Sequence, residues 1–333
     1  MNYLISIIIP CYNCECFVTA TIEMLLQQDI SECELILVND GSKDSTLSIL
    51  RQYETLHENI HVIDQLNQGV SVARNVGMLA AQGKYIYFLD SDDTLTKGTL
   101  DHFKQVVMEH SDCQMLLFGY ETRRNGRTCK SYVFPPFDGV AFSGYTLQRS
   151  FLSKKICCHI CSCVYDKEFC LRNRLLFKQG VKIGEDIHFL LQLIDKVDRA
   201  YYSKRVSFIY QIRNDSVMQG YANYSDDNFN SFLLIKDFLS DVDGQLHFAA
   251  NFFISISFIS NMVLYLKSPC ISKGIEKQFL QEKRVLYSPM HLNSFYSIII
   301  YCFRLLPLQL LFKLKSIKYN LNIKYEFHMH GFF

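Results

Sequence analysis

One run of acidic residues in this sequence has the composition of a metal–diphosphate site. Asp90, Asp92 and Asp93 follow directly on the apolar run 85–89. Three carboxylates at the end of a buried strand repel one another and are costly to desolvate. A divalent cation relieves this repulsion, and Mg²⁺ or Mn²⁺ typically takes one or two protein carboxylates while phosphates complete its shell. The run therefore suits a metal–diphosphate site, although an isolated Asp-x-Asp is also typical of a helix N-cap.

A second acidic pair, Glu185 and Asp186, follows Gly184 and precedes the helix-like run 187–194. Acidic residues in the first turn of a helix are favoured by its dipole, which is the structural interpretation of the pair. The chemical interpretation is a general base, a carboxylate that takes the proton from an attacking hydroxyl. The spacing alone leaves both interpretations open.

Two arginines could neutralise phosphate near these acids. Arg74 follows the turn-forming pair Gln68-Gly69 on a predicted helix, and Arg213 follows the strand-like run 206–210. Arginine binds phosphate oxygens in pairs through its planar fork of donors. Taken singly, either residue could equally be an ordinary surface arginine.

The elements that must position these residues alternate along the first 120 residues. Short apolar runs with the length and composition of buried strands occur at 4–9, 35–38, 60–63, 85–89 and 115–118. Between them, apolar residues fall on one helical face within 18–26, 49–56 and 72–79. This alternation predicts an α/β fold, a mainly parallel sheet flanked by helices. In such a sheet ligands bind beyond the carboxyl ends of the strands, where the polar residues cluster.

Four segments in this order resemble the family 2 glycosyltransferases. They are Ser6–Asn13, Leu37–Asp44, Asn67–Asn75 and Tyr87–Asp93. The resemblance covers residues 1–120 densely and resumes at 184–186 and 210–216. Any one segment is weak, but the four at this spacing are specific. The resemblance implies a GT-A fold and an inverting transfer of sugar from a nucleotide-sugar donor, with UDP as the nucleotide by family precedent.

The resemblance also assigns roles to individual residues. Pro10, Tyr12 and Asp40 would hold the base, and Asp90 would contact the ribose. Asp92 would ligate the Mn²⁺ or Mg²⁺ that bridges the diphosphate. Arg74 and Arg213 would lie beside the nucleotide, and Asp186 would be the catalytic base. Metal and arginines would then stabilise the charge on the departing nucleoside diphosphate.

Composition narrows the class of protein. The 333 residues carry a formal net charge of +1, which argues against nucleic acid as a partner. Thirteen cysteines cannot form a closed set of disulfides, and the first apolar run is too short for a signal peptide, so we expect a cytoplasmic protein with free thiols. The cluster 157–163 contains Cys and His, but a single strand cannot surround zinc, and buried thiols on a core strand are the expectation.

The last third of the chain is predicted to be helical. We expect a catalytic domain over 1–220 and a helical region over 221–333. The apolar run 248–266 is interrupted by polar residues and favours a buried helix. The run 295–314 is divided by Arg304 and Pro307, and lysines at 313, 315 and 318 follow. That run could lie on the inner face of an anionic membrane or pack on the catalytic domain.

Other functions explain less of the pattern. A nucleotidyltransferase would use Asp90 and Asp92 but leaves Asp186 without a role. A scaffold that binds nucleotide without turnover is the non-enzyme alternative. A dehydrogenase is poorly supported because no G-x-G-x-x-G follows the first strand. The sequence does not specify the sugar, and the acceptor is expected to be a glycan or a lipid-linked glycan by family analogy.

Overall fold

The computed structural model of the chain describes residues 3–212, 224–242, 244–290 and 295–320. Contacts divide the chain into two units. The sheet unit comprises Met1–Gln148 and Lys155–Arg213, and the helical unit comprises Arg149–Lys154 and Asn214–Phe333. The predicted boundary at residue 220 lies outside the described residues and stays a prediction.

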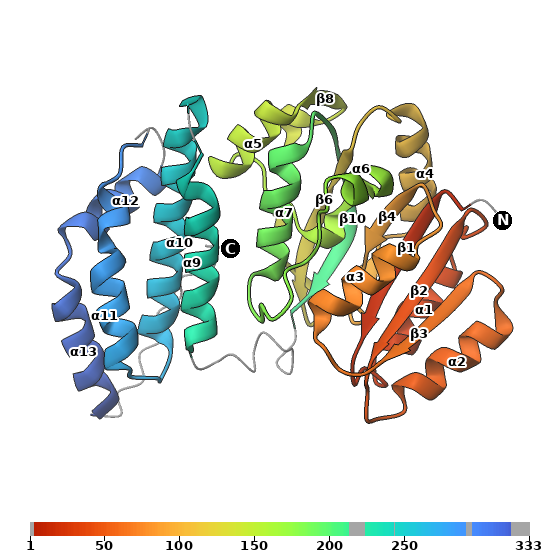
Figure 1. Ribbon diagram of the computed structural model, residues 1–333, viewed down its shortest axis with the longest axis horizontal. Coiled ribbons are helices and arrows are strands. Elements are labelled where there is room, and N and C mark those ends of the chain that lie inside the picture. Colours follow the sequence, from red (N-terminus) through yellow and green to blue (C-terminus); the bar gives the residue numbers. More distant parts are fainter. Residues whose placement is uncertain (1–2, 213–223, 243, 291–294, 321–333) are drawn as a thin grey trace. The chain divides into compact units, whose positions relative to one another are not determined.

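A ten-stranded sheet forms the centre of the sheet unit, in the order β3-β2-β1-β4-β9-β6-β10-β5, with β7 beside β6 and β8 beside β10 (Figure 1). Its strands are β1 Ile5–Cys11, β2 Cys33–Asp40, β3 Ile60–Gln65, β4 Tyr85–Phe88, β5 Thr94–Leu95, β6 Met115–Arg124, β7 Arg127–Tyr132, β8 Val140–Ser143, β9 Cys163–Asp166 and β10 Arg199–Gln211. Pairing is parallel from β3 to β4 and between β6 and β10. The other pairs are antiparallel. The α/β fold is confirmed, and the sheet is mixed as a whole because parallel pairing is concentrated in its first four strands.

The first two strands are mostly apolar and buried because helices cover the sheet. The helices of this unit are α1 Val18–Leu26, α2 Thr46–Leu56, α3 Val70–Ala80, α4 Thr99–Glu109, α5 Gly144–Leu152, α6 Lys167–Arg172 and α7 Glu185–Lys196. Helix α3 packs on β1 and β2 (Figure 1). A Cβ on Gly77 of α3 would lie 2.4 Å from Cγ2 of Ile8, so glycine permits the close approach. This packing fixes α3 against the strands whose carboxyl ends carry the polar loops.

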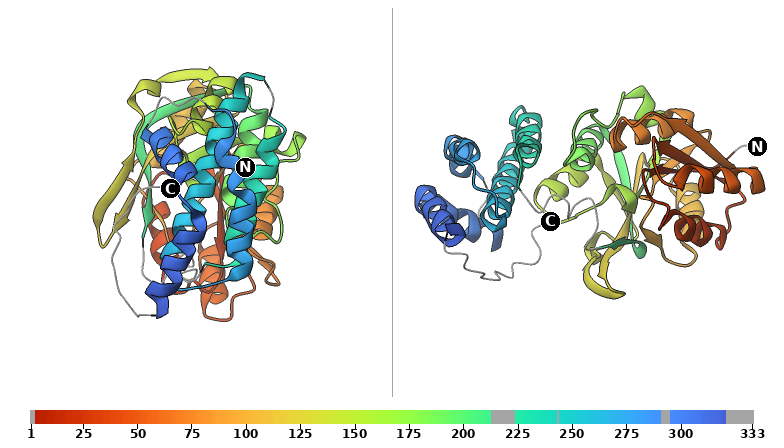
Figure 2. Two further views of the ribbon diagram at one scale, coloured as in Figure 1. Left: turned by 90° about the vertical axis from the view of Figure 1, so that its left-hand side faces the viewer. Right: turned by 90° about the horizontal axis from the view of Figure 1, so that it is seen from below.

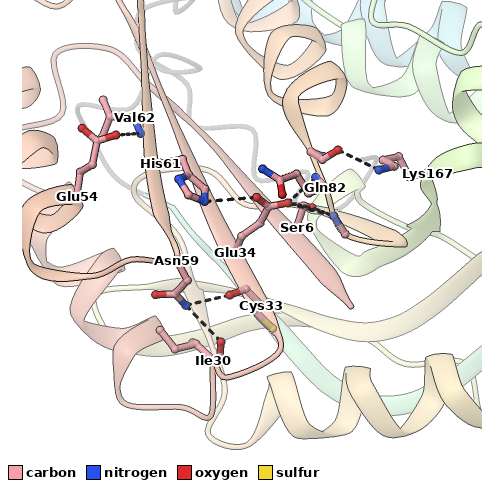
Figure 3. Close-up of polar contacts among 12 residues, drawn as sticks. Ser6, Ile30, Cys33, Glu34, Glu54, Asn59, His61, Val62, Gln82 and Lys167 are labelled. Carbon is pink, nitrogen blue, oxygen red and sulfur yellow. Dashed lines mark hydrogen bonds and ion pairs between the residues drawn. The ribbon is translucent and has the colours of Figure 1, made fainter. Parts of the chain in front are cut away.

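A buried carboxylate joins the amino-terminal part of the sheet to the turn before β4 (Figure 3). Glu34 of β2 is fully buried. Its Oε1 accepts hydrogen bonds from Ser6 Oγ at 2.5 Å, from the Gln82 backbone N–H at 2.6 Å and from the Gly83 N–H at 3.1 Å. Its Oε2 lies 3.7 Å from His61 Nε2 on β3. One carboxylate oxygen therefore satisfies three donors from two segments of the chain, which favours keeping it in a core where an unpaired charge would be costly.

We expect the change Glu34→Ala to destabilise the protein by about 3–5 kcal/mol, because three donors would lose a buried acceptor. The free energy of unfolding in urea measures the effect. The matched change at the exposed neighbour, Glu32→Ala, is expected to cost less than about 0.5 kcal/mol. Equal losses from the two variants would contradict a structural role for the Glu34 carboxylate.

The helical unit contains α9 Asp226–Ser240, α10 His247–Lys267, α11 Lys273–Glu282, α12 Phe295–Leu305 and α13 Leu308–Asn320. Helix α10 packs against α9, α12 and α13, and α11 packs against α13 (Figure 2). Among the described residues, Gly244–Lys267 has the length and hydropathy of a membrane span, and 67% of its apolar window is buried inside the protein. The predicted buried helix over 248–266 is thus confirmed. Helices α12 and α13 also pass that test as a pair, but the chain bends by 82° between them, at the predicted break near Pro307.

Candidate active site

Two hydrogen bonds connect the loop after β1 to the loop after β2. Asn13 adopts a left-handed φ of 47°, its side-chain Oδ1 accepts from the Lys43 N–H at 2.8 Å, and its own N–H donates to Ser42 Oγ at 3.0 Å. Tyr12, in the same loop, is 48% exposed, and Pro10 is half-buried near the end of β1. A tyrosine ring that is fixed at its backbone and open at its face can stack on a planar ligand.

Asp40 ends β2 and is 3% exposed. Its Oδ1 accepts from Gln65 Nε2 at 2.7 Å and from the Gln68 N–H at 2.9 Å, and its Oδ2 accepts from the Gly69 N–H at 2.8 Å. A carboxylate has about four acceptor sites, so three bonds leave room for one more donor. Asp40 therefore shapes the turn that begins α3, and its predicted contact with a base stays a prediction.

The three aspartates after β4 divide into two environments. Asp90 and Asp92 are half-buried, whereas Asp93 is 1% exposed. Asp93 Oδ1 accepts from the Gln211 N–H at 2.9 Å, and this bond ties the turn to β10. Asp93 is therefore a structural anchor, and Asp90 and Asp92 are the two carboxylates with access to a ligand.

Arg74 of α3 joins the two predicted acidic groups. Its side chain is buried, with Nη2 2.8 Å from Asp90 Oδ1 and Nη1 3.1 Å from Glu185 Oε1. The guanidinium carbon also lies 5.2 Å from the centre of the Phe177 ring. Arg74 was predicted beside the nucleotide; in the structure it bridges Asp90, predicted at the ribose, and the pair that contains the predicted base.

The start of α7 is positioned by two features. Gly184 caps the helix with a φ of 81°, a conformation that glycine adopts without strain. Upstream, Asn75 Nδ2 donates to the Phe177 carbonyl and the Phe177 N–H donates to Asn75 Oδ1, both at 2.8 Å. Asp186 is half-buried, and its Oδ1 accepts from the N–H of Ile187 at 2.7 Å. The acidic pair is therefore held against α3 at a helix N-terminus, which favours negative charge.

Burial and the neighbouring charges shift the pKa values of this network in opposite directions. Burial opposes the charge on Arg74, but Asp90 and Glu185 outweigh it and raise the pKa of the guanidinium. Burial likewise opposes ionisation of Asp90, but Arg74 holds the pKa of that carboxyl below its usual value. Burial and the adjacent Asp186 raise the pKa of Glu185 despite Arg74. Arg74 thus favours the ionised form of Asp90 more strongly than that of Glu185.

The two acidic groups act on one common point, the phenol of Tyr210 on β10. Burial, followed by the negative charges of Asp93, Asp90, Asp92 and Asp186 in that order, together raise the pKa of Tyr210 to about 12. Residues that lie more than 90 positions apart in the sequence therefore share one electrostatic environment. The predicted metal–diphosphate side and the predicted base side belong to the same site.

His159 is a site residue that the sequence analysis did not single out. Its ring stacks on Phe208 at 5.1 Å, and its Nδ1 accepts from the Cys161 N–H at 3.2 Å, so the neutral ring carries its proton on Nε2. Burial lowers the pKa of His159, and Asp186 and Asp90 partly offset this effect. The surrounding segment forms a 3₁₀ turn at Ile160–Ser162 where a core strand was expected. Its cysteines 158, 161 and 163 are buried thiols, as predicted, whereas Cys157 is only half-buried.

The donor atoms of the site fit a hard divalent cation. Asp92, the predicted metal ligand, is half-buried, and its carboxylate offers the oxygen ligands that Mg²⁺ and Mn²⁺ prefer. Among the described residues, no three or more His, Cys, Asp or Glu side chains are arranged to hold a metal ion. A cation here would therefore take few protein ligands and complete its shell with phosphate and water, as expected for Mg²⁺ at a diphosphate. Arg213, the remaining predicted residue, lies outside the described residues.

Comparison with known proteins gives a consistent family. Residues 6–169 match the family described as Glycosyl transferase family 2. The chain is 30% identical over 215 residues to TuaG of Bacillus subtilis, whose name assigns it to teichuronic acid biosynthesis, covering 64% of this chain and 81% of TuaG. It is 30% identical to EpsJ of the same organism, an uncharacterized glycosyltransferase, over 65% of this chain. The chain spans 63% of the length of EpsJ.

Solved structures resemble the chain over nearly its whole length. TarS 1–349 of S. aureus in complex with UDP superposes with a TM-score of 0.66 at 20% identity, covering 98% of this chain and 94% of that one. The mannosyltransferase PcManGT of Pyrobaculum calidifontis, in complex with GDP-Man and Mn²⁺, gives a TM-score of 0.57 at 14% identity, covering 97% and 89%. At these identities the likeness concerns the fold.

Proposed function

The chain belongs to glycosyl transferase family 2, and from that premise we propose that it is an inverting glycosyltransferase that moves a sugar from a nucleotide-sugar onto an acceptor hydroxyl. The family resemblance seen in the sequence is thereby confirmed. The observation that carries the proposed activity is the Arg74 bridge between Asp90 and Glu185. It connects the part of the site suited to a diphosphate with the part that contains a candidate base.

We assign the donor pocket to the loops after β1, β2 and β4. Tyr12, Pro10 and Asp40 hold the base, and Asp90 contacts the ribose. Asp92 holds the divalent cation, which when bound would neutralise charge on the diphosphate. We propose UDP as the nucleotide. The structural relative TarS has been solved with UDP-GlcNAc, while PcManGT holds GDP-Man and Mn²⁺, so the nucleotide is a point to be tested.

We assign the proton transfer to Asp186. The acceptor oxygen forms a bond to the anomeric carbon as the bond from that carbon to the diphosphate breaks. Asp186 takes the proton of the acceptor hydroxyl, and the nucleoside diphosphate leaves from the opposite face, which inverts the anomeric centre. Glu185 is less suited to this role because its carboxylate is engaged by Arg74. A nucleotidyltransferase would give Asp186 no comparable task.

For the acceptor we propose a glycan or a lipid-linked glycan of a surface polysaccharide. The name of the relative TuaG refers to teichuronic acid biosynthesis, which supports this class. We place the reaction in the cytoplasm, which is a reducing compartment. All thirteen cysteines are free thiols, which suits that compartment.

Calorimetric titration of UDP, GDP and dTDP, each with and without Mn²⁺, tests the donor site. We expect UDP to bind most tightly and only with the metal. The change Asp92→Asn should weaken binding of UDP in Mn²⁺ by about 100-fold, because a metal ligand is lost, and should change little without Mn²⁺.

The control is Asp101→Asn, which removes one negative charge from an exposed position on α4. It should leave the titration unchanged. If folded protein binds none of the nucleotides, the donor site is wrong. If UDP binds but the protein neither transfers sugar to an acceptor nor hydrolyses the UDP-sugar, the protein is a nucleotide-binding scaffold.

A further inference from the structure

The end of the helical unit exposes a set of large apolar side chains, which we call the α12–α13 face. Its members are between 51% and 69% exposed: Tyr287, Ile298, Tyr301, Leu305, Leu310 and Leu314. Exposed apolar residues elsewhere on the chain, such as Leu56 and Leu66, are scattered singly, which is normal for a protein surface. A cluster on two consecutive helices calls for a partner.

The spacing of these residues places them on continuous stripes. Ile298, Tyr301 and Leu305 follow at three and four residues, so they share one side of α12. Tyr287 adjoins this stripe, because its hydroxyl donates to the Arg304 carbonyl at 2.9 Å and its ring lies 5.9 Å from the Arg304 guanidinium. Leu310 and Leu314, four residues apart, share one side of α13.

The opposite sides of both helices are already packed. Ile300, Leu308 and Phe312 are buried, and the Phe312 ring lies 5.9 Å from that of Tyr265 on α10. Lys283 Nζ donates to the Leu306 carbonyl at 2.9 Å, which ties the bend between the helices to the preceding segment. The α12–α13 face is therefore a second apolar side on helices whose core side is complete.

The charged residues along the segment that carries the face have one sign. Residues 283–320 contain no Asp or Glu, and their basic residues are Lys283, Arg284, Arg304, Lys313, Lys315 and Lys318. Arg284 and Lys313 are exposed, and Arg304 is half-buried. Lys315, which the sequence suggested for a membrane surface, is instead buried, and its Nζ donates to the Tyr265 carbonyl. Outward leucines and isoleucine, two tyrosines and a cationic border form the pattern of a helix lying at a membrane interface.

We propose that the α12–α13 face rests on an anionic phospholipid leaflet, with its apolar side chains among the acyl chains and its cations at the headgroups. A second copy of the chain fits less well, because two such faces would bring cations together without acidic partners. Because the chain bends by 82° between the two helices, they do not form one straight membrane span. This surface goes beyond the transfer reaction and does not depend on the donor or the base.

Co-sedimentation of the full chain with vesicles tests the proposal. Wild-type protein should bind vesicles of phosphatidylcholine with phosphatidylglycerol more tightly than vesicles of phosphatidylcholine alone, and added salt should reduce the difference. The triple change Ile298→Ser, Tyr301→Ser and Leu305→Ser should lower partitioning by about 100-fold, because three inserted side chains are lost. A matched control, Leu56→Ser, Leu66→Ser and Leu79→Ser, removes equally exposed apolar side chains from the sheet unit and should bind like wild type.

Charge variants separate the electrostatic part. Arg284→Gln with Lys313→Gln should lower binding to anionic vesicles by about 25-fold, since each surface cation contributes about fivefold, and should not change binding to phosphatidylcholine. Arg172→Gln with Lys196→Gln, on the sheet unit, should bind as wild type. If both apolar triples bind equally, or if the wild type is a dimer that the α12–α13 triple converts to a monomer without any vesicle binding, the proposal is wrong. Far-UV circular dichroism and UDP titration of each variant identify any that fail to fold.

Discussion

The change Asp186→Asn is expected to lower kcat by about 10³-fold while leaving the affinity for UDP within about twofold. The carboxylate that takes the acceptor proton is lost, and general bases contribute about 10²–10⁴-fold. Donor binding should survive because the residues assigned to base, ribose and metal lie on other loops. Asparagine keeps the size of the side chain and can still accept from the Ile187 N–H, so α7 should begin as before. Single-turnover transfer from UDP-sugar, with calorimetry on the same sample, measures both quantities.

The adjacent carboxylate supplies the matched control. Glu185→Gln should lower kcat by less than about tenfold, because an amide oxygen can still accept a hydrogen bond from Arg74. If Glu185→Gln abolished transfer and Asp186→Asn did not, the assignment of the base would have to be exchanged. If both variants turned over at the rate of the wild type, neither residue would be the base.

The strands of the first half of the sheet could be predicted because they are buried on both faces. β1 and β2 are mostly apolar and buried along nearly their whole length, and short apolar runs bounded by polar turn residues are typical of buried parallel strands. The carboxyl ends of β1, β2 and β4 then follow from the topology of the sheet, and with them the positions of Tyr12, Asp40 and Asp90. The antiparallel strands β7 to β9 are short or half-exposed, and their sequences carry no such pattern.

The contacts within the site could not be predicted, because they join distant segments. Nothing in the spacing of Arg74 and Glu185, 111 residues apart, indicates that they form an ion pair. In the sequence, Asp90, Asp92 and Asp93 are three acidic residues of one run. Only the hydrogen bond from β10 distinguishes Asp93 as a structural residue. His159 was grouped with neighbouring cysteines, while its stacking on Phe208 depends on β10. Lys313 and Lys315 are two residues apart, about 200° around the helix, and this rotation separates a surface cation from a buried one.

The change Arg74→Met is expected to destabilise the protein by about 3–5 kcal/mol at pH 7.5. Arg74 is the buried partner of two carboxylates whose side chains are only 26% and 14% exposed, Asp90 and Glu185. Removing one member of a buried ion pair leaves an uncompensated charge, which is far more costly than losing an exposed pair. The free energy of unfolding in urea measures the loss. Arg172→Met, at a mostly exposed position paired with Glu168, should change it by less than about 0.5 kcal/mol.

The loss should depend on pH with a definite sign. Burial and Asp186 already raise the pKa of Glu185, whereas Arg74 holds the pKa of Asp90 below its usual value. Without Arg74 both pKa values should rise. A carboxyl whose pKa is higher in the folded than in the unfolded state destabilises the fold as pH rises above the unfolded value. The difference between Arg74→Met and wild type should therefore be largest near pH 7.5 and shrink as the pH falls toward about 4.5. A difference that does not change with pH would mean that lost packing on Phe177, not charge, accounts for the effect.

A second substitution separates charge from catalysis. Adding Glu185→Gln to Arg74→Met removes one of the two stranded carboxylates and should restore about half of the lost stability. It should not restore transfer, because the ion pairs that link the start of α7 to the turn carrying Asp90 would still be absent. Recovery of stability without recovery of kcat would mean that Arg74 acts as a positioning residue for Asp186. If transfer returned together with stability, Arg74 would serve the fold alone, and the bridge would no longer support the proposed activity.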